Sequence, residues 1–219
     1  MEVREDYGTH EKTFGSYKMK MLDCFCGLGG ASEGFHREGF ECTGIEIDPK
    51  IANLYPYKVI IANMRDLAGE NFRDYDVIWG SPPCKDFSKL PSKSTTKKGV
   101  HREWRVPKNP EEGLKNVHVY LNFIEKAKPK IWIMENVSGL CQHIHISPTL
   151  ITHIGYTEKG FKGMKRAFWG NFPPFLMTRQ STIGKERISS PLKKWIRAKI
   201  PLACSLAFAK ACKQKLVEA

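Results

Sequence analysis

The chain has 219 residues, 41% of them apolar, a length that favours one domain, or one domain with a small addition. Its 35 Lys and Arg residues against 23 Asp and Glu residues leave a net charge of +12, which favours a polyanionic partner such as nucleic acid. Seven scattered cysteines cannot all pair, which excludes a complete disulfide framework and fits a reducing, intracellular compartment.

Residues 1–17 are polar, lack the apolar core of a signal peptide and are expected to form a flexible arm. Strands and helices then alternate. The predicted strands cover Lys18–Cys24, Glu41–Ile47, Tyr57–Ala62, Tyr75–Trp79 and Lys130–Met134. The predicted helices cover Ala31–Glu38, Pro49–Tyr55 and Glu111–Lys126. This alternation predicts an α/β fold with a mostly parallel sheet, helices on both faces, and ligands beyond the carboxyl ends of the strands.

The remaining segments carry weaker patterns. Residues 85–109 are polar and basic, without a period, and are predicted to be a loop. After residue 140 we expect a helix at Ser147–Ile154, a hairpin, a loop and a closing amphipathic helix. The hairpin strands are Gly155–Phe161 and Lys165–Phe172, the loop is Phe172–Ser190, and the last helix is Ile200–Leu216. No apolar run approaches the length of a membrane span.

The first strand ends in DCFCGLGG, residues 23–30. Glycines after a strand let the backbone approach a cofactor closely, and Glu46 at the end of the second strand could bind a ribose hydroxyl. A nicotinamide dinucleotide remains an alternative, although its third glycine would fall at Ser32. A tight turn without a ligand is the other alternative. Cys24 and Cys26 flank Phe25 in an apolar segment, so buried packing is expected there and no metal site is predicted.

The fourth strand ends in Ser81-Pro82-Pro83-Cys84. Two prolines make a rigid, extended turn, which would hold the thiol at the cleft. A thiolate attacks electron-poor carbons, and basic surroundings such as Lys85 favour that ionised form. The alternative is a cysteine that only packs in the core. We predict that Cys84 is a nucleophile.

Glu135-Asn136-Val137 directly follows the apolar segment IWIM. A carboxyl group at the end of a buried strand is costly unless it has a partner or a function. A partly protonated Glu135 could bind a ring nitrogen of a nucleobase. The alternative is a glutamate that caps the next turn.

These three segments, in this order and at these spacings, resemble the DNA cytosine-5 methyltransferase family. The resemblance covers residues 19–140 well and implies a Rossmann-like fold with S-adenosylmethionine as cofactor. It implies a cofactor site formed by Asp23, Phe25, Gly27, Leu28, Gly29, Glu46, Ile47, Asn63, Met64 and Pro83.

The chain departs from the family pattern at two places. Asn63 stands where the family usually has an aspartate that contacts the adenine amino group, with Asp66 as a substitute if the register slips. Arg166 best matches the last arginine of a Gln-x-Arg-x-Arg motif whose glutamine is absent and whose first arginine is replaced by Met164. A surface charge on the hairpin is the alternative for Arg166.

The resemblance implies covalent catalysis on a cytosine that has left the base stack. Cys84 would attack carbon 6, Glu135 would bind nitrogen 3, and Arg166 would contact the carbonyl. Residues 85–109 would be a mobile active-site loop, since residues 85–108 carry eight basic and two acidic side chains, a net +6. The residues expected to contact nucleic acid are Ser88, Lys97, Lys98, Arg102, Trp104 and Arg105.

We expect a catalytic domain at residues 18–170, a vestigial target-recognition segment at 171–199 and a returning helix at 200–219. The second segment is too short for an independent domain. It holds further basic residues that could contact phosphates: Lys185, Arg187, Lys193, Lys194, Arg197 and Lys199.

The predicted partner is double-stranded DNA, read with a relaxed site or a separate specificity partner. The protein is expected to be cytoplasmic, of prokaryotic, viral or phage type, without a membrane partner, and a monomer or weak dimer. Three alternatives remain: the same chemistry on RNA, methylation of an exocyclic amino group, and a non-catalytic nucleic-acid-binding module. Amino-group methyltransferases place an aromatic residue after Ser-Pro-Pro, where this chain has Cys84.

Overall fold

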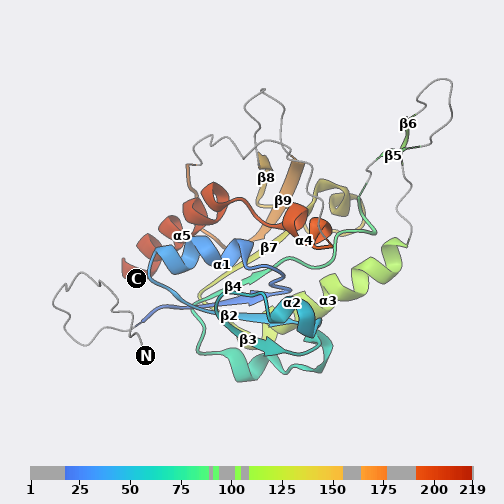
Figure 1. The fold of residues 1–219 in the computed structure, drawn as a ribbon. Helices are drawn as coiled ribbons and strands as arrows, with labels where there is room; N and C mark the ends of the chain where they lie inside the picture. Colours follow the sequence, from blue (N-terminus) through green and yellow to red (C-terminus); the bar gives the residue numbers. More distant parts are fainter. Residues whose placement is uncertain are drawn as a thin grey trace.

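The computed structural model describes residues 18–88, 91–93, 102–104, 109–154, 164–176 and 191–218, with the backbone alone at 91–93 and 102–104. Seven strands form one sheet in the order β3-β2-β1-β4-β7-β9-β8 (Figure 1). In that order their bounds are Lys58–Ile61, Glu41–Glu46, Lys20–Cys24, Val77–Gly80, Ile131–Val137, Met164–Gly170 and Leu150–Ile154. In this part of the chain no helix is long and apolar enough to cross a membrane.

Five neighbouring strands, β3, β2, β1, β4 and β7, run parallel, and β9 runs antiparallel to both β7 and β8. β1 lies between β2 and β4, so the chain leaves the centre of the sheet in both directions. A crevice forms at such a reversal, beyond the carboxyl ends of the strands. The predicted Rossmann-like α/β fold with a mostly parallel sheet is therefore confirmed.

Helices cover both faces of the sheet (Figure 1). The core on one side contains Phe35 and Phe208 from two different helices, and the core on the other side contains Tyr120 and Phe123 from a third. Trp79 of β4 is completely buried, and its ring lies 5.0 Å from that of Phe208. The helices are α1 (Gly30–Arg37), α2 (Pro49–Ala52), α3 (Pro110–Ala127), α4 (Lys193–Ala198) and α5 (Leu202–Val217).

The closing helix α5 packs directly on α1. A Cβ atom at Gly34 would lie 2.3 Å from the carbonyl carbon of Ser205, and one at Gly30 would lie 2.5 Å from the backbone nitrogen of Ile200. Glycine at both positions lets the two segments approach this closely. The predicted closing helix is confirmed, and its first turn follows Pro201. The division into domains stays a prediction.

Three expectations about secondary structure were wrong. Residues 150–154, predicted as part of a helix, form β8, because Leu-Ile-Thr-His-Ile is rich in β-branched residues and pairs along β9. The hairpin therefore joins β8 to β9, while Gly155–Phe161 lies outside the described residues. The predicted loop 85–109 contains an antiparallel pair, β5 (Pro91–Lys93) and β6 (Arg102–Trp104). Nor was the short helix α4 predicted, since so short a helix depends on tertiary packing.

Candidate active site

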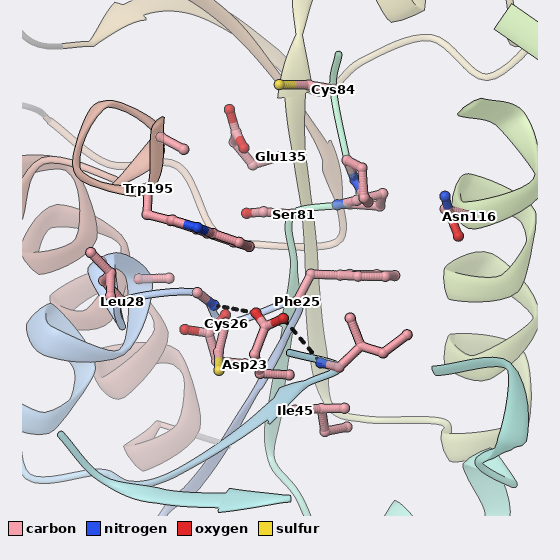
Figure 2. Close-up of a pocket in the computed structure, with 18 of the residues that line it drawn as sticks. Asp23, Phe25, Cys26, Leu28, Ile45, Ser81, Cys84, Asn116, Glu135 and Trp195 are labelled. Carbon is pink, nitrogen blue, oxygen red and sulfur yellow. Dashed lines mark hydrogen bonds between the residues drawn. The ribbon is translucent and has the colours of Figure 1, made fainter. Parts of the chain in front are cut away.

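A cavity of about 580 Å³ opens at the carboxyl ends of β1, β2, β4 and β7. Its lining includes the three residues predicted to be catalytic and every predicted cofactor residue except Gly29. Figure 2 shows Cys84 and Glu135 at one end of this pocket, and Asp23, Phe25 and Ile45 at the other. The structure thus brings the three motif segments together in one place.

The turn after β1 has an unusual backbone. Phe25, Gly27 and Gly29 have positive φ angles of 60°, 52° and 72°. Gly29 serves the fold, since it precedes α1 and a Cβ there would lie 3.1 Å from Pro56 and 3.2 Å from Tyr55. Gly29 does not line the pocket, and its place in the cofactor site stays a prediction. Phe25, Gly27 and Leu28 do line the pocket.

Asp23 lies beneath this turn, with only 2% of its surface exposed. Its Oδ2 accepts a hydrogen bond of 2.6 Å from the Ser32 hydroxyl, whose oxygen lies 2.6 Å from the Tyr55 hydroxyl. Burial raises the pKa of Asp23 to about 7, against the opposing effect of the Ser32 hydrogen bond. The carboxyl group is therefore partly protonated near neutral pH.

Glu46 organises the backbone around the pocket. One carboxylate oxygen accepts the Gly27 N–H at 3.1 Å, and the other accepts the N–H groups of Ile47 and Asp48, both at 3.0 Å. The oxygen that accepts only the Gly27 N–H has room for a further donor. Ile47 is 62% exposed and lines the pocket, so an apolar surface stands open beside the carboxylate.

Asn63 lines the pocket at the start of a 3-10 helix, Met64–Asp66 (η1). Its Oδ1 accepts the Arg65 N–H at 3.1 Å, so the amide is oriented by this cap. Met64 is buried and also lines the pocket. Asp66 is exposed and does not line it, so the structure does not support Asp66 as a substitute for the missing aspartate.

The loop that carries Cys84 is held from two sides. At its base a Cβ on Gly80 would lie 2.2 Å from the ring of Tyr120, so only glycine fits. The Tyr120 hydroxyl donates to two backbone carbonyl oxygens, that of Ile78 at 3.1 Å and that of Ile133 at 2.8 Å. Beyond Gly80, the side-chain amide of Asn136 donates to the Pro82 carbonyl at 3.0 Å. All seven cysteines are free thiols, and Cys84 is one of two that are not buried.

Glu135 and Arg166 form a buried ion pair beside Cys84. Arg166 Nε lies 2.6 Å from Glu135 Oε1, and their side chains are only 8% and 9% exposed. The alternative that Arg166 is a surface charge is therefore wrong. Burial raises the pKa of Glu135, while the Arg166 charge and a hydrogen bond from Ser81 lower it.

The thiol of Cys84 does not have the basic surroundings that the sequence suggested. Burial raises its pKa, the negative charge of Glu135 raises it further, and Arg166 acts in the opposite direction. Lys85 is exposed to solvent. The positive charge of Arg166 favours the thiolate, as expected of a basic neighbour, but burial and Glu135 outweigh it in the free protein and the pKa of Cys84 is raised overall.

Ser81 and Trp195 are among the pocket residues that the sequence did not predict to belong to the site. Ser81 was treated only as part of the turn, although it lines the pocket beside Glu135. Trp195 of α4 reaches into the pocket beside the turn that carries Cys26 and Leu28 (Figure 2). A Cβ at Gly27 would lie 3.5 Å from its ring. A lone tryptophan in a basic segment was the available signal.

Most of the residues predicted to contact nucleic acid have side chains that the structure does not describe. Ser88 is half-buried and does not line the pocket. Only the backbone of Arg102 and Trp104 is described, in β6. Lys194 and Lys199, predicted to contact phosphates, line the pocket, and Lys199 pairs with Glu33 at 3.1 Å. Outside the described residues lie Lys97, Lys98, Arg105, Lys185 and Arg187.

Comparisons with known proteins agree with this geometry. The model of the C-5 cytosine-specific DNA methylase family matches residues 19–157. The type II methyltransferase M.FnuDI of Fusobacterium nucleatum is 32% identical over 127 residues, which make up 56% of this chain and 33% of that protein. A Frog virus 3 (isolate Goorha) protein assigned as a DNA (cytosine-5)-methyltransferase is 24% identical over 172 residues, 77% of each chain.

Among solved structures, a prophage-encoded protein of E. coli assigned to the DNA modification methyltransferases superposes with a TM-score of 0.51. It is 18% identical and covers 70% of this chain and 46% of that one, so it supports the fold alone. The chain spans about a third of the length of the type II relatives it matches.

Proposed function

Because the chain belongs to the C-5 cytosine-specific DNA methylase family, we propose that it methylates carbon 5 of cytosine in DNA, with S-adenosylmethionine as the methyl donor and Cys84 as a covalent nucleophile. One observation carries this proposal. Cys84, Glu135 and Arg166 line the same cavity as Phe25, Glu46 and the other residues of the expected cofactor site.

The part of the pocket around β1 and β2, here called the cofactor half, has residues that fit S-adenosylmethionine. The Glu46 carboxylate, held by three backbone N–H groups, can accept one further hydrogen bond, from a ribose hydroxyl. The exposed side chain of Ile47 can cover one face of the adenine ring, and the amide oxygen of Asn63 can accept from its amino group. When bound, the cofactor supplies an electrophilic methyl group next to the catalytic residues.

Cys84 performs the covalent step. Its thiolate forms a bond to carbon 6 of the cytosine, and the electron pair of the 5,6 double bond moves to carbon 5. Carbon 5 takes the methyl group and then loses its proton to a base, which returns the electron pair and breaks the bond between Cys84 and carbon 6. Because the pKa of Cys84 is raised, the thiolate is a minor form in the free protein. The positive charge of Arg166 acts against this shift and favours the reactive thiolate.

Glu135 and Arg166 hold the base during this step. In its protonated form Glu135 donates a hydrogen bond to nitrogen 3, which withdraws electrons from carbon 6 and makes it easier to attack. Burial raises the pKa of Glu135 in the direction that this role requires. Arg166, fixed by its 2.6 Å contact with Glu135, can direct its remaining N–H groups to the carbonyl oxygen.

A covalent trap tests the proposal. DNA duplexes of random sequence that contain 5-fluorocytosine are incubated with the protein and S-adenosylmethionine. Fluorine cannot leave carbon 5 as a proton does, so the bond from Cys84 to carbon 6 should persist. We expect a species of protein plus oligonucleotide plus one methyl group in denaturing mass spectrometry, absent without the cofactor.

Two variants make the trap specific. Cys84→Ser should abolish the adduct, and Cys141→Ser, the other cysteine that is not buried, should leave it unchanged. An adduct in Cys84→Ser, or methylation of the exocyclic amino group, would contradict the proposed chemistry. Parallel reactions with single-stranded DNA and with RNA test which polymer is the substrate. An adduct that forms only on RNA would show that the substrate is RNA and not DNA.

A further inference from the structure

Lys199 stands between α4 and α5, and its side chain lines the cavity. The aliphatic part lies against the start of α1, since a Cβ at Gly30 would lie 2.6 Å from Lys199 Cγ. The ammonium nitrogen lies 3.1 Å from Oε2 of Glu33, and Arg37 holds the other oxygen of Glu33 at 2.8 Å. Both ends of the Lys199 side chain are therefore fixed beside the cavity.

The surroundings of Lys199 suit an anionic ligand group. A lysine ammonium has three N–H donors, and the contact with Glu33 uses one of them. Gly30 and Ala31, the first residues of α1, also line the cavity, and the N-terminal end of a helix favours negative charge. The remaining donors of Lys199 can therefore bind an anion together with this end of α1.

The adenosine part of S-adenosylmethionine belongs to the opposite side of the pocket. Asn63, which is expected at the adenine, is two residues from Arg65, whose guanidinium contacts the amide oxygen of Asn116 at 3.4 Å. Figure 2 shows Asn116 across the pocket from Leu28 and Trp195. The wall formed by α4 and by the turn after β1 is therefore left for the amino-acid part of the cofactor, which ends in a carboxylate.

The positions of the other cations point to Lys199 as the partner of that carboxylate. Among the described residues, five cationic side chains line the cavity: Arg65, Lys85, Arg166, Lys194 and Lys199. The first lies on the adenine side, the second follows the proposed nucleophile, and the third pairs with Glu135 at 2.6 Å. Lys194 is exposed, and its ammonium nitrogen lies 4.9 Å from the centroid of the Trp195 ring. Lys199 is the cation that an ion pair holds at the wall formed by α4.

We propose that Lys199, held by Glu33, binds the carboxylate of S-adenosylmethionine and makes the site selective for a cofactor with an intact amino-acid end. This inference rests on the proposed function, because it takes S-adenosylmethionine as the cofactor. It assigns Lys199 to the cofactor and not to the DNA phosphates that the charge of its segment suggested.

The test compares two ligands that differ in one group. Decarboxylated S-adenosylmethionine keeps the adenosine, the sulfonium and the amine but lacks the carboxylate. Isothermal titration without DNA gives the Kd of each ligand. Lys199→Met should raise the Kd for S-adenosylmethionine about 3- to 10-fold, because a charge-assisted contact is lost at a partly exposed site. The Kd for the decarboxylated ligand should change less than about 2-fold.

Two further variants make the test specific. Lys199→Arg keeps the positive charge and should retain most of the affinity for S-adenosylmethionine. Lys213→Met is a matched control, because Lys213 also joins α5 to α1 by an ion pair, with Glu38 at 3.8 Å, but does not line the cavity. This control should leave both Kd values unchanged. Binding of the decarboxylated ligand with unchanged Kd also shows that Lys199→Met is folded.

An equal rise of Kd for both ligands in Lys199→Met, or an unchanged Kd for S-adenosylmethionine, would overturn the inference. So would a loss of selectivity in Lys194→Met and not in Lys199→Met. If the two Kd values respond as expected but no 5-fluorocytosine adduct forms, the proposed chemistry is contradicted and the role of Lys199 is supported. A protein that binds neither ligand would contradict both proposals.

Discussion

The two halves of the pocket are built in different ways. In the cofactor half, around β1 and β2, the Glu46 carboxylate binds three backbone N–H groups, and the turn after β1 has positive φ angles. In the other half, around β4, β7 and β9 and here called the catalytic half, the proposed function depends on side chains: the ion pair of Glu135 and Arg166 beside Cys84.

This difference predicts how each half responds to substitution. Backbone contacts survive a change of side chain, so the cofactor half can accept Asn63 where the family usually has an aspartate. A buried ion pair cannot lose one member without leaving the other uncompensated. Substitutions in the catalytic half should therefore cost more than substitutions in the cofactor half.

Arg166→Met should destabilise the protein by about 3–5 kcal/mol at pH 8, because it leaves Glu135 charged and unpaired in a buried site. The loss should be smaller at pH 5, where Glu135, whose pKa is raised by burial, can take up a proton instead. Urea unfolding of the variant and of the unmodified protein at pH 5 and at pH 8 measures the change in the free energy of unfolding. Adding Glu135→Gln should recover most of the loss, and equal losses at both pH values would contradict the prediction.

Asp23→Asn should change how stability depends on pH. The pKa of Asp23 is raised from its ordinary value of 3.8 to about 7 in the folded state. A raised pKa means that the folded protein keeps a proton that the unfolded chain loses, so this contribution to stability is full below about pH 4 and is lost as the pH rises to 7. The loss should amount to about 2–4 kcal/mol.

The measurement for Asp23 is the free energy of unfolding between pH 4 and pH 8. The difference in stability, Asp23→Asn minus unmodified protein, should grow over this range. Asp74→Asn is a suitable control, because that carboxylate pairs with Lys20 at the surface. A difference that stays constant with pH would show that Asp23 titrates normally.

Trp195→Ala should weaken the binding of S-adenosylmethionine about 10-fold, since it removes an aromatic wall of the pocket against Gly27. Trp195→Phe should retain most of the affinity. Isothermal titration with the cofactor measures both, and kcat at saturating cofactor should change little. An unchanged affinity in Trp195→Ala would place this residue outside the cofactor site.

Asn63→Asp should strengthen cofactor binding about 3-fold, because a charged acceptor forms a stronger hydrogen bond to an amino group than an amide does. The carboxylate should also keep the cap on the Arg65 N–H. The measurement is the same titration, with Asp66→Asn as the control at an exposed position. Weaker binding in Asn63→Asp would show that this side chain does not face the adenine.

The sequence alone was sufficient for the parallel part of the sheet and for the three motif segments. Most strands of the parallel part of the sheet (β1, β2, β3, β4 and β7) have short apolar runs, and glycine or proline follows several of them, so local chemistry indicates both the structure and the place of the site. The meeting of Cys84, Glu135 and Glu46 in one pocket could be predicted, because motif order along the chain places them at strand ends that a parallel sheet brings together.

Only the tertiary structure decided the electrostatics and the far wall of the pocket. Arg166 is buried because β9 pairs with β7, a long-range contact that no local pattern reports. Trp195 belongs to a six-residue helix that depends on packing, and the Ser81 hydroxyl accepts a hydrogen bond from the indole of the buried Trp79. The pKa of Cys84 is raised, against expectation, because burial depends on the whole fold and not on the next residue.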